Sequence, residues 1–386
     1  MTFKIFSALM LSAGLSVGAT TAMAQSMETA TMADHSGHEG HQMMDHAGMD
    51  HGAMGHAGHI PGPIGVMGDH AHKKGGVMLS YRFMRMDMAG NRIGSSNVPN
   101  DLIATTIPNS FFGMPGQPPT LRIVPTDMTM DMHMFGAMYA ASDRVTLMAM
   151  VPYIEKSMNH LTYMGGAGTT VLGGFHTSTE GIGDVKVSAL VGVMSQGNHK
   201  LNFNIGLSLP TGSITETGQV LTPMGMRPTI RLPYAMQLGS GTYDLMPGLT
   251  YMGHSGDFGY GAQLRGVIRL GSNDEGYSLG DEVAGSLWAS YQPKPGFSLT
   301  GRIEAKSVGT IDGRDPLIMG PVQTADPLNY GGDTVTLYAG VNLVGQKGAL
   351  RGHRFGIEAG VPVYQNLNGP QMETDWTLTL GWTKAF

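Results

Sequence analysis

The chain of 386 residues contains no cysteine, which excludes disulfides, thiolate metal sites and cysteine nucleophiles. Charged residues make up only 13% of it, against about 25% in ordinary globular domains, so a typical soluble enzyme is not expected. The net charge of −6 offers no basic surface for a polyanion, and we expect no nucleic-acid partner. Any metal chemistry must depend mainly on the 32 methionines and 15 histidines.

Long hydrophobic runs are also scarce. The apolar run from Ile5 to Val17 follows Lys4, and Ala22-Met23-Ala24 supplies small residues for cleavage, so residues 1–24 are predicted to be a secretory signal peptide. No later segment reaches 18 uninterrupted apolar positions, which argues against a membrane-spanning helix. If the mature chain enters a membrane, a closed β-barrel is the remaining architecture, because lipid tolerates no unpaired backbone groups.

Residues 25–74 are predicted to be a periplasmic arm. The segment has almost no aromatic or β-branched residues, so it cannot bury a core and is expected to be disordered in isolation. Thioether sulfur prefers Cu(I), whereas imidazole suits Cu(II), zinc or nickel, and a mixture of the two favours copper. A solvated linker with incidental metal affinity, or a zinc or nickel site, are the alternatives. The candidate metal ligands are His35, His38, His41, Met43, Met44, His46, Met49, His51, Met54, His56, His59, His70 and His72.

Residues 75–386 are predicted to form a transmembrane antiparallel β-barrel of about 12 strands in an all-β fold. Apolar and polar residues alternate with a period of two, most clearly in Leu201–Leu209, so that one face suits lipid and the other water. The candidate strands are 76–87, 129–140, 143–154, 183–195, 199–210, 242–253, 257–270, 279–292, 296–308, 332–345, 349–363 and 373–386.

The lengths of the joints between these strands support a barrel. Joints of two or three residues, such as 141–142 and 254–256, alternate with joints of eight to about forty residues. Outer-membrane barrels have short periplasmic turns and longer external loops, which predicts that both termini face the periplasm. A secreted β-sandwich is the competing fold, but its strands are shorter, about 5–6 residues. A barrel of this size should have a narrow or plugged lumen.

The strand around Met128–Met134 has methionine at even positions and Thr129, Asp131 and His133 at odd ones. We expect the methionines to face lipid, because the opposite register would drive Asp131 into hydrocarbon at a cost of up to roughly 2–4 kcal/mol. A methionine ladder inside the barrel is the alternative. The predicted lumen residues are Arg82, Asp131, His133, Lys186, Asp244, Arg265, Arg269, Arg302, Glu304, Lys306, Arg354 and Glu358.

Three parts of the chain resemble known groups. Residues 34–59 are similar to the Met/His-rich repeats of proteobacterial copper-resistance envelope proteins, including their outer-membrane B component. Gly181–Val187 and Leu207–Gly212 resemble the GxGD and LPTG elements of the family named for the meta-pathway of phenol degradation, which implies a barrel that moves hydrophobic or aromatic compounds. The C-terminal residues 376–386, which end on Phe386, resemble the assembly signal of bacterial outer-membrane proteins.

These observations predict an outer-membrane channel for small solutes, involved in copper or other transition-metal handling, whose arm captures metal at the periplasmic mouth. A passive channel for hydrophobic or aromatic compounds and a barrel-anchored metal-sequestering protein are the alternatives. No enzyme is expected, since no nucleotide, zincin or hydrolase motif appears and His254-Ser255 fits a polar turn. The expected partners are the outer-membrane bilayer and metal ions or small solutes. No cofactor is expected to be required; copper ions are candidates only as ligand or cargo, and a homo-oligomer is left open.

Overall fold

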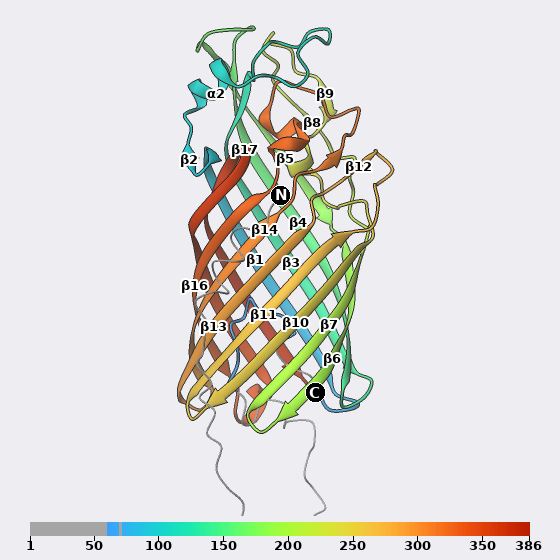
Figure 1. Ribbon diagram of the computed structural model, residues 1–386, viewed down its shortest axis with the longest axis vertical. Coiled ribbons are helices and arrows are strands. Elements are labelled where there is room, and N and C mark those ends of the chain that lie inside the picture. Colours follow the sequence, from blue (N-terminus) through green and yellow to red (C-terminus); the bar gives the residue numbers. More distant parts are fainter. Residues whose placement is uncertain (1–59, 69–71) are drawn as a thin grey trace, which may run out of the picture. The chain divides into compact units, whose positions relative to one another are not determined.

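A computed structural model describes residues 60–68 and 72–386. In this part of the chain, long antiparallel strands form the wall of a closed barrel (Figure 1), which confirms the predicted fold class. The wall strands are β1 (Val77–Gly94), β3 (Ile123–Ala140), β4 (Val145–Tyr163), β6 (Val185–Gln196), β7 (His199–Leu209), β10 (Asp244–Ser255), β11 (Phe258–Arg269), β13 (Glu282–Lys294), β14 (Phe297–Val308), β16 (Gly332–Val344) and β17 (His353–Ala385).

The barrel closes through β17. Residues 354–367 of this strand pair with β16, and residues 367–385 pair with β1. Both pairings are antiparallel, so the 33-residue β17 runs through the wall in both directions and turns near Gly369, which has a φ of +67°. The eleven labelled wall strands therefore provide about twelve crossings, as the sequence predicted. Among the described residues, no helix is long and apolar enough to cross a membrane.

The two ends of the barrel differ in their connections. At one end, here called the turn end, β6 and β7, β10 and β11, and β13 and β14 are joined by two residues each. The opposite end, here called the loop end, carries the long connections (Figure 1). Short elements within these connections are β2 (Ser96–Asn97), α2 (Asn100–Thr106), β8 (Thr217–Gln219), β9 (Thr229–Arg231), η2 (Tyr234–Met236), β12 (Tyr277–Ser278), β15 (Asp312–Gly313), η3 (Gln323–Ala325) and η4 (Pro327–Asn329). The turn end holds η5 (Gly348–Leu350).

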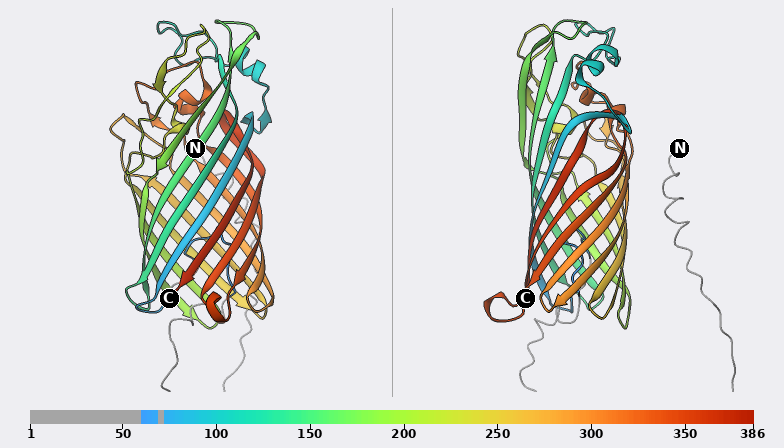
Figure 2. Two further views of the ribbon diagram at one scale, coloured as in Figure 1. Left: turned by 180° about the vertical axis from the view of Figure 1, so that it is seen from behind. Right: turned by 90° about the vertical axis from the view of Figure 1, so that its left-hand side faces the viewer.

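One long strand, β5 (Val171–Ile182), was not predicted, and neither were the short strands of the long connections. It pairs with β4 over Tyr153–Tyr163, whereas β6 pairs with β4 over Val145–Met150. The β4–β5 hairpin therefore continues the wall beyond the rim at the loop end (Figure 2). Its sequence contains Gly173 and Gly174 and few apolar residues, which is why the alternation that marks the other strands is absent.

The GxGD and LPTG elements meet where β5 passes into β6. The Thr211 hydroxyl donates to the carbonyl of Gly183 over 2.8 Å and accepts from the Val185 amide over 2.9 Å. Asp184 accepts from the amide of Gly212 over 3.0 Å and from the amide of Ser240 over 2.7 Å. The two motifs thus form one polar joint that fastens the loop following β7 to the rim of the barrel.

The outer face of the wall is apolar over a limited height. On β4, Leu147 and Val151 are exposed, while the next outward positions toward the loop end are Tyr153 and then Glu155. On β3, Tyr139 and Phe135 are the corresponding exposed side chains. This apolar band is what a lipid-facing barrel surface requires.

The register of β3 is the opposite of the one predicted. Phe135 is 55% exposed and Met134 only 8%, so the odd positions of β3 face outward and the methionines face inward. Asp131 and His133 are therefore outside the lumen. They lie beyond Phe135, at the edge of the apolar band, where the cost of a charge falls to about 0–1 kcal/mol.

Both of these outward groups have partners. Asp131 pairs with Arg85 over 3.3 Å, and the Tyr81 hydroxyl lies 2.8 Å from Nδ1 of His133. The prediction failed because it assumed that the apolar band extends along the whole strand.

Candidate functional site

Residues 60–68, here called the plug segment, lie in the lumen although the sequence grouped them with the arm. Their backbone carbonyls accept hydrogen bonds from side chains of several wall strands: Ser290 of β13 to Pro61, Asn342 of β16 to Gly62, and Gln263 of β11 to Met67. Val66 packs against Met252 and Trp288. Donors from strands on several sides of a barrel can converge only in its interior, so the plug segment crosses the lumen.

A buried charged pair anchors the middle of the plug segment. Arg302 pairs with Glu358, with Nε at 3.1 Å from Oε1, and its guanidinium lies 3.6 Å from the ring centroid of Tyr338. The Gly65 amide donates to Glu358 over 3.4 Å. A Cβ at Gly65 would lie 2.7 Å from Oε1 of Glu358, so only glycine fits here without displacing the pair. Nearer the turn end, Arg354 donates to the carbonyl of Gly62 over 2.5 Å.

The structure places most of the predicted lumen charges on the inner face and pairs many of them with each other. Arg269 binds Asp244 over 2.5 Å, and Glu304 accepts from Arg265 over 3.2 Å and from Arg302 over 3.0 Å. The charges on the inner face of the wall therefore largely neutralise one another. The residues that alternate onto the inner face are Arg82, Lys186, Asp244, Arg265, Arg269, Arg302, Glu304, Lys306, Arg354 and Glu358.

The opposite side of the lumen is a methionine wall, formed by the inner faces of β1, β3 and β4. Strand pairing sets many of these methionines side by side, for example Met84 opposite Met132 and Met86 opposite Met130. A cavity of about 190 Å³ lies between these four side chains, Gly65 of the plug segment and Arg302. The methionine wall consists of Met78, Met84, Met86, Met88, Met128, Met130, Met132, Met134, Met138, Met148, Met150 and Met158.

A second, larger cavity of about 610 Å³ lies among the connections at the loop end. Apolar side chains provide most of its lining, including Phe175, Val220 and Leu232. Val220 and Leu232 also pack in one cluster with Met128 and Met158 of the methionine wall. An apolar surface therefore continues from the loop-end cavity to the lumen.

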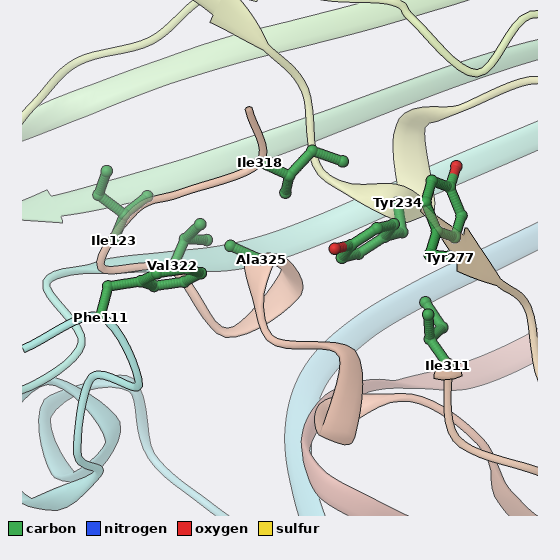
Figure 3. Packing of buried hydrophobic residues seen from close by; sticks show 8 residues of the cluster. All are labelled: Phe111, Ile123, Tyr234, Tyr277, Ile311, Ile318, Val322 and Ala325. Atoms are coloured by element: carbon green, nitrogen blue, oxygen red, sulfur yellow. The ribbon is translucent and has the colours of Figure 1, made fainter. Parts of the chain in front are cut away.

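The connections around this cavity have a core of their own. Figure 3 shows the buried side chains of one apolar cluster, to which Phe111, Tyr234 and Val322 belong although they come from three separate connections. Beside them, the fully buried Arg122 donates to five backbone carbonyls, among them those of Ala104 and Met164 at 2.9 and 2.8 Å. Burial lowers the pKa of Arg122. These contacts hold the loop end in one folded arrangement.

Most of the predicted metal ligands of the arm, from His35 to His59 together with His70, lie outside the described residues. His72 is described: it is buried, and its amide donates to Thr146 over 3.4 Å. Among the described residues, no group of three or more His, Cys, Asp or Glu side chains could hold a metal ion. The size of the barrel predicted a narrow or plugged lumen, but sequence reasoning missed that residues 60–68 enter the lumen, and it missed the loop-end cavity. The change from His/Met-rich sequence to Ile60-Pro61-Gly62-Pro63-Ile64 was a signal for the plug segment.

Comparison with solved structures finds similar barrels. The chain resembles the COG4313 outer membrane channel from Pseudomonas putida F1 with a TM-score of 0.51 and 13% identity, over 82% of this chain and 97% of that one. The Ralstonia pickettii toluene transporter TbuX matches at a TM-score of 0.44 and 10% identity, over 81% and 90% of the two chains. A Pseudomonas aeruginosa FadL homologue matches at 0.41 and 9%, over 81% and 90%. The fold is therefore that of the COG4313 outer membrane channel.

No family model and no curated protein matches the chain. The resemblances to the meta-pathway family and to copper-resistance proteins therefore stay predictions.

The fit of Gly65 leads to a first testable prediction. In Gly65→Leu the new side chain collides with Glu358 and Arg302, so the plug segment should leave its position and the ion conductance of the barrel in planar bilayers should rise several-fold. Gly301→Leu is the matched control, because a Cβ there meets nothing within 4 Å. Equal conductance of the two variants would show that the plug segment does not limit passage.

A second prediction concerns pH. His160 lies on the β4–β5 hairpin beyond the apolar band, is buried, and stacks on Phe175 with ring centroids 4.5 Å apart. Burial, aided by the charge of His176, lowers its pKa from 6.5 to about 4. The unfolded hairpin therefore binds more protons, so its stability is complete above about pH 6.5 and falls as the pH drops toward 4.

Hydrogen exchange of the amides around His160 should therefore accelerate at pH 4.5 relative to pH 7.5, after correction for intrinsic rates. His160→Phe keeps the stacking and should abolish this acceleration. His199→Phe, at the exposed turn end, should leave it unchanged. An identical pH response in the His160→Phe variant would contradict the assignment.

Proposed function

We propose that the protein is an outer-membrane channel that admits small hydrophobic solutes. The single observation that carries the proposal is the cavity of about 610 Å³ at the loop end, whose apolar lining continues into the methionine wall. Its volume lies within the range of about 300–1,000 Å³ typical of small-molecule sites. A compound with one or two aromatic rings fits such a space.

Several further features support this assignment. The apolar band suits lipid, and the fold is shared with a protein described as an outer membrane channel. In barrels of this kind the long connections face outward, which would put the loop-end cavity at the external surface and the arm in the periplasm. The passage is narrow, since Met128, Met158 and Leu232 pack together below the cavity. Methionine is flexible enough to repack around a passing solute.

A test of this function narrows the cavity. Val220→Trp overfills a site where such changes cost about 1–3 kcal/mol, so uptake of radiolabelled toluene by expressing cells should fall roughly tenfold or more. Val361→Trp provides the control, because Val361 is 56% exposed on the outer face. Uptake that is equal in both variants, with equal amounts of folded protein in the outer membrane, would reject the loop-end cavity as the entry site.

A second candidate function is copper handling, with the arm as the site of capture. The observation that favours it is that the side chains of the methionine wall face the lumen, as a methionine ladder inside the barrel requires. The His/Met-rich sequence ends at His59, directly before the plug segment. A channel that carries both features would combine a metal-capturing tether with a thioether-lined interior.

The arm can be tested without disturbing the plug segment. Replacing every His and Met between residues 34 and 59 by Ser keeps the chain length and retains Ile60–Gly68. Under the copper function, cells that express this variant should lose copper tolerance while toluene uptake is unchanged. Unchanged copper tolerance would reject the copper function and leave the hydrophobic channel as the single proposed function. If the wild-type protein showed no measurable flux of any solute, a metal-sequestering anchor would be favoured instead.

A further inference from the structure

The plug segment covers the lumen unevenly. Its hydrogen bonds go to strands between β7 and β17: Gly68 accepts from Asn202, Met67 accepts from Gln263, and Gly65 donates to Glu358. The methionine wall on β1, β3 and β4 lies on the other side of the 190 Å³ cavity. The lumen space next to the plug segment is therefore bordered by thioether sulfur.

Four of these methionines form a compact array, here called the methionine quartet: Met84, Met86, Met130 and Met132. Met84 faces Met132 and Met86 faces Met130 across adjacent strands, and within each strand the two methionines are two residues apart on the same face. Directly opposed positions have Cβ atoms about 4.5–5.5 Å apart, and each methionine has three rotatable bonds. All four line the same cavity, so their sulfurs can converge on one ion.

The charges around the cavity select the class of ion. Glu304 accepts from Arg265 and Arg302, and Glu358 accepts from Arg302 and from the Gly65 amide. Both carboxylates are thus paired with guanidinium groups, which disfavours their use as ligands of Mg²⁺ or Ca²⁺. The lining of the cavity carries four basic side chains, Arg85, Arg265, Arg302 and Lys306, and one acidic one, Glu304. Arg85 is paired with Asp131 and Arg302 with Glu358 outside the lining, so this group of charges keeps an excess of one positive charge. A monovalent cation is therefore less disfavoured than a divalent one. Soft d¹⁰ ions such as Cu(I) and Ag(I) bind neutral thioethers.

We propose that the methionine quartet is a binding site for a soft monovalent metal ion, Cu(I) or its analogue Ag(I), within the lumen. It deepens the second candidate function by giving copper a site in the barrel as well as on the arm. The hydrophobic channel does not depend on it. A lining for hydrophobic solutes needs only apolar side chains about as large as methionine, whereas metal binding needs the thioether sulfur. Replacing the methionines by leucine keeps the apolar lining and removes the sulfur, so it distinguishes the two functions.

The test uses the mature full-length protein in detergent, with Ag(I) as the probe. The quartet variant carries Met84→Leu, Met86→Leu, Met130→Leu and Met132→Leu, changes that conserve volume and should preserve folding. The matched control carries four substitutions at exposed methionines of the loop end: Met164→Leu, Met224→Leu, Met226→Leu and Met319→Leu. Heat-modifiable migration on gels checks that each barrel is folded.

The quartet variant should lose about one tightly bound silver ion per chain, the content of a single thioether site, while the control loses none. Crystals soaked in Ag(I) should show an anomalous peak among the four sulfurs in the wild type and none there in the quartet variant. Equal silver content in the wild type and the quartet variant would overturn the proposal. So would anomalous peaks confined to other methionines and histidines, or an organic anion such as benzoate filling the cavity in preference to silver. Toluene uptake by the quartet variant reports on the channel separately.

Discussion

Closure of the sheet is the constraint on which the rest of the structure depends. A barrel wall must pair every backbone group, and the pairing of β17 with β1 removes the last free edges. Once the sheet is closed, side chains alternate between lipid and lumen with a period of two, and a shift of one residue would exchange the two faces of a strand. The lumen chemistry is thus determined by register, and the methionine wall follows from it.

The register of β3 shows how far sequence patterning reaches. The alternation identified nearly all wall strands, because a lipid-facing side leaves a periodic apolar signal. Around Met128–Met134, however, both faces were plausible: thioether on one, carboxylate and imidazole on the other. Residues that are distant in sequence determine which face of β3 points outward, because Arg85 pairs with Asp131 and Tyr81 contacts His133. A polar residue is tolerated on the outer face once the apolar band has ended.

The site was less predictable than the wall for a related reason. The plug segment has no periodicity, and its position depends on donors more than a hundred residues away, such as Asn342 and Arg354. The loop-end cavity is assembled from separate connections whose only common feature is burial against one another, as with Phe111 and Tyr234. Sequence reasoning identified Arg302 and Glu358 as lumen residues, but nothing in the pattern indicated that they hold Gly65.

The division of the lumen into two sides connects these features. Charged groups on β11 to β17 bind the plug segment and each other, while the β1, β3 and β4 side carries mainly thioethers, with Arg82 and Lys156 as exceptions. In the sequence, residues 34–59 lead directly into the plug segment, which is bonded to the lumen wall. A tethered ligand meets a fixed site at high effective concentration without any new contact. The plug segment, which narrows the lumen, therefore also connects the His/Met-rich arm to the barrel that carries the methionine wall.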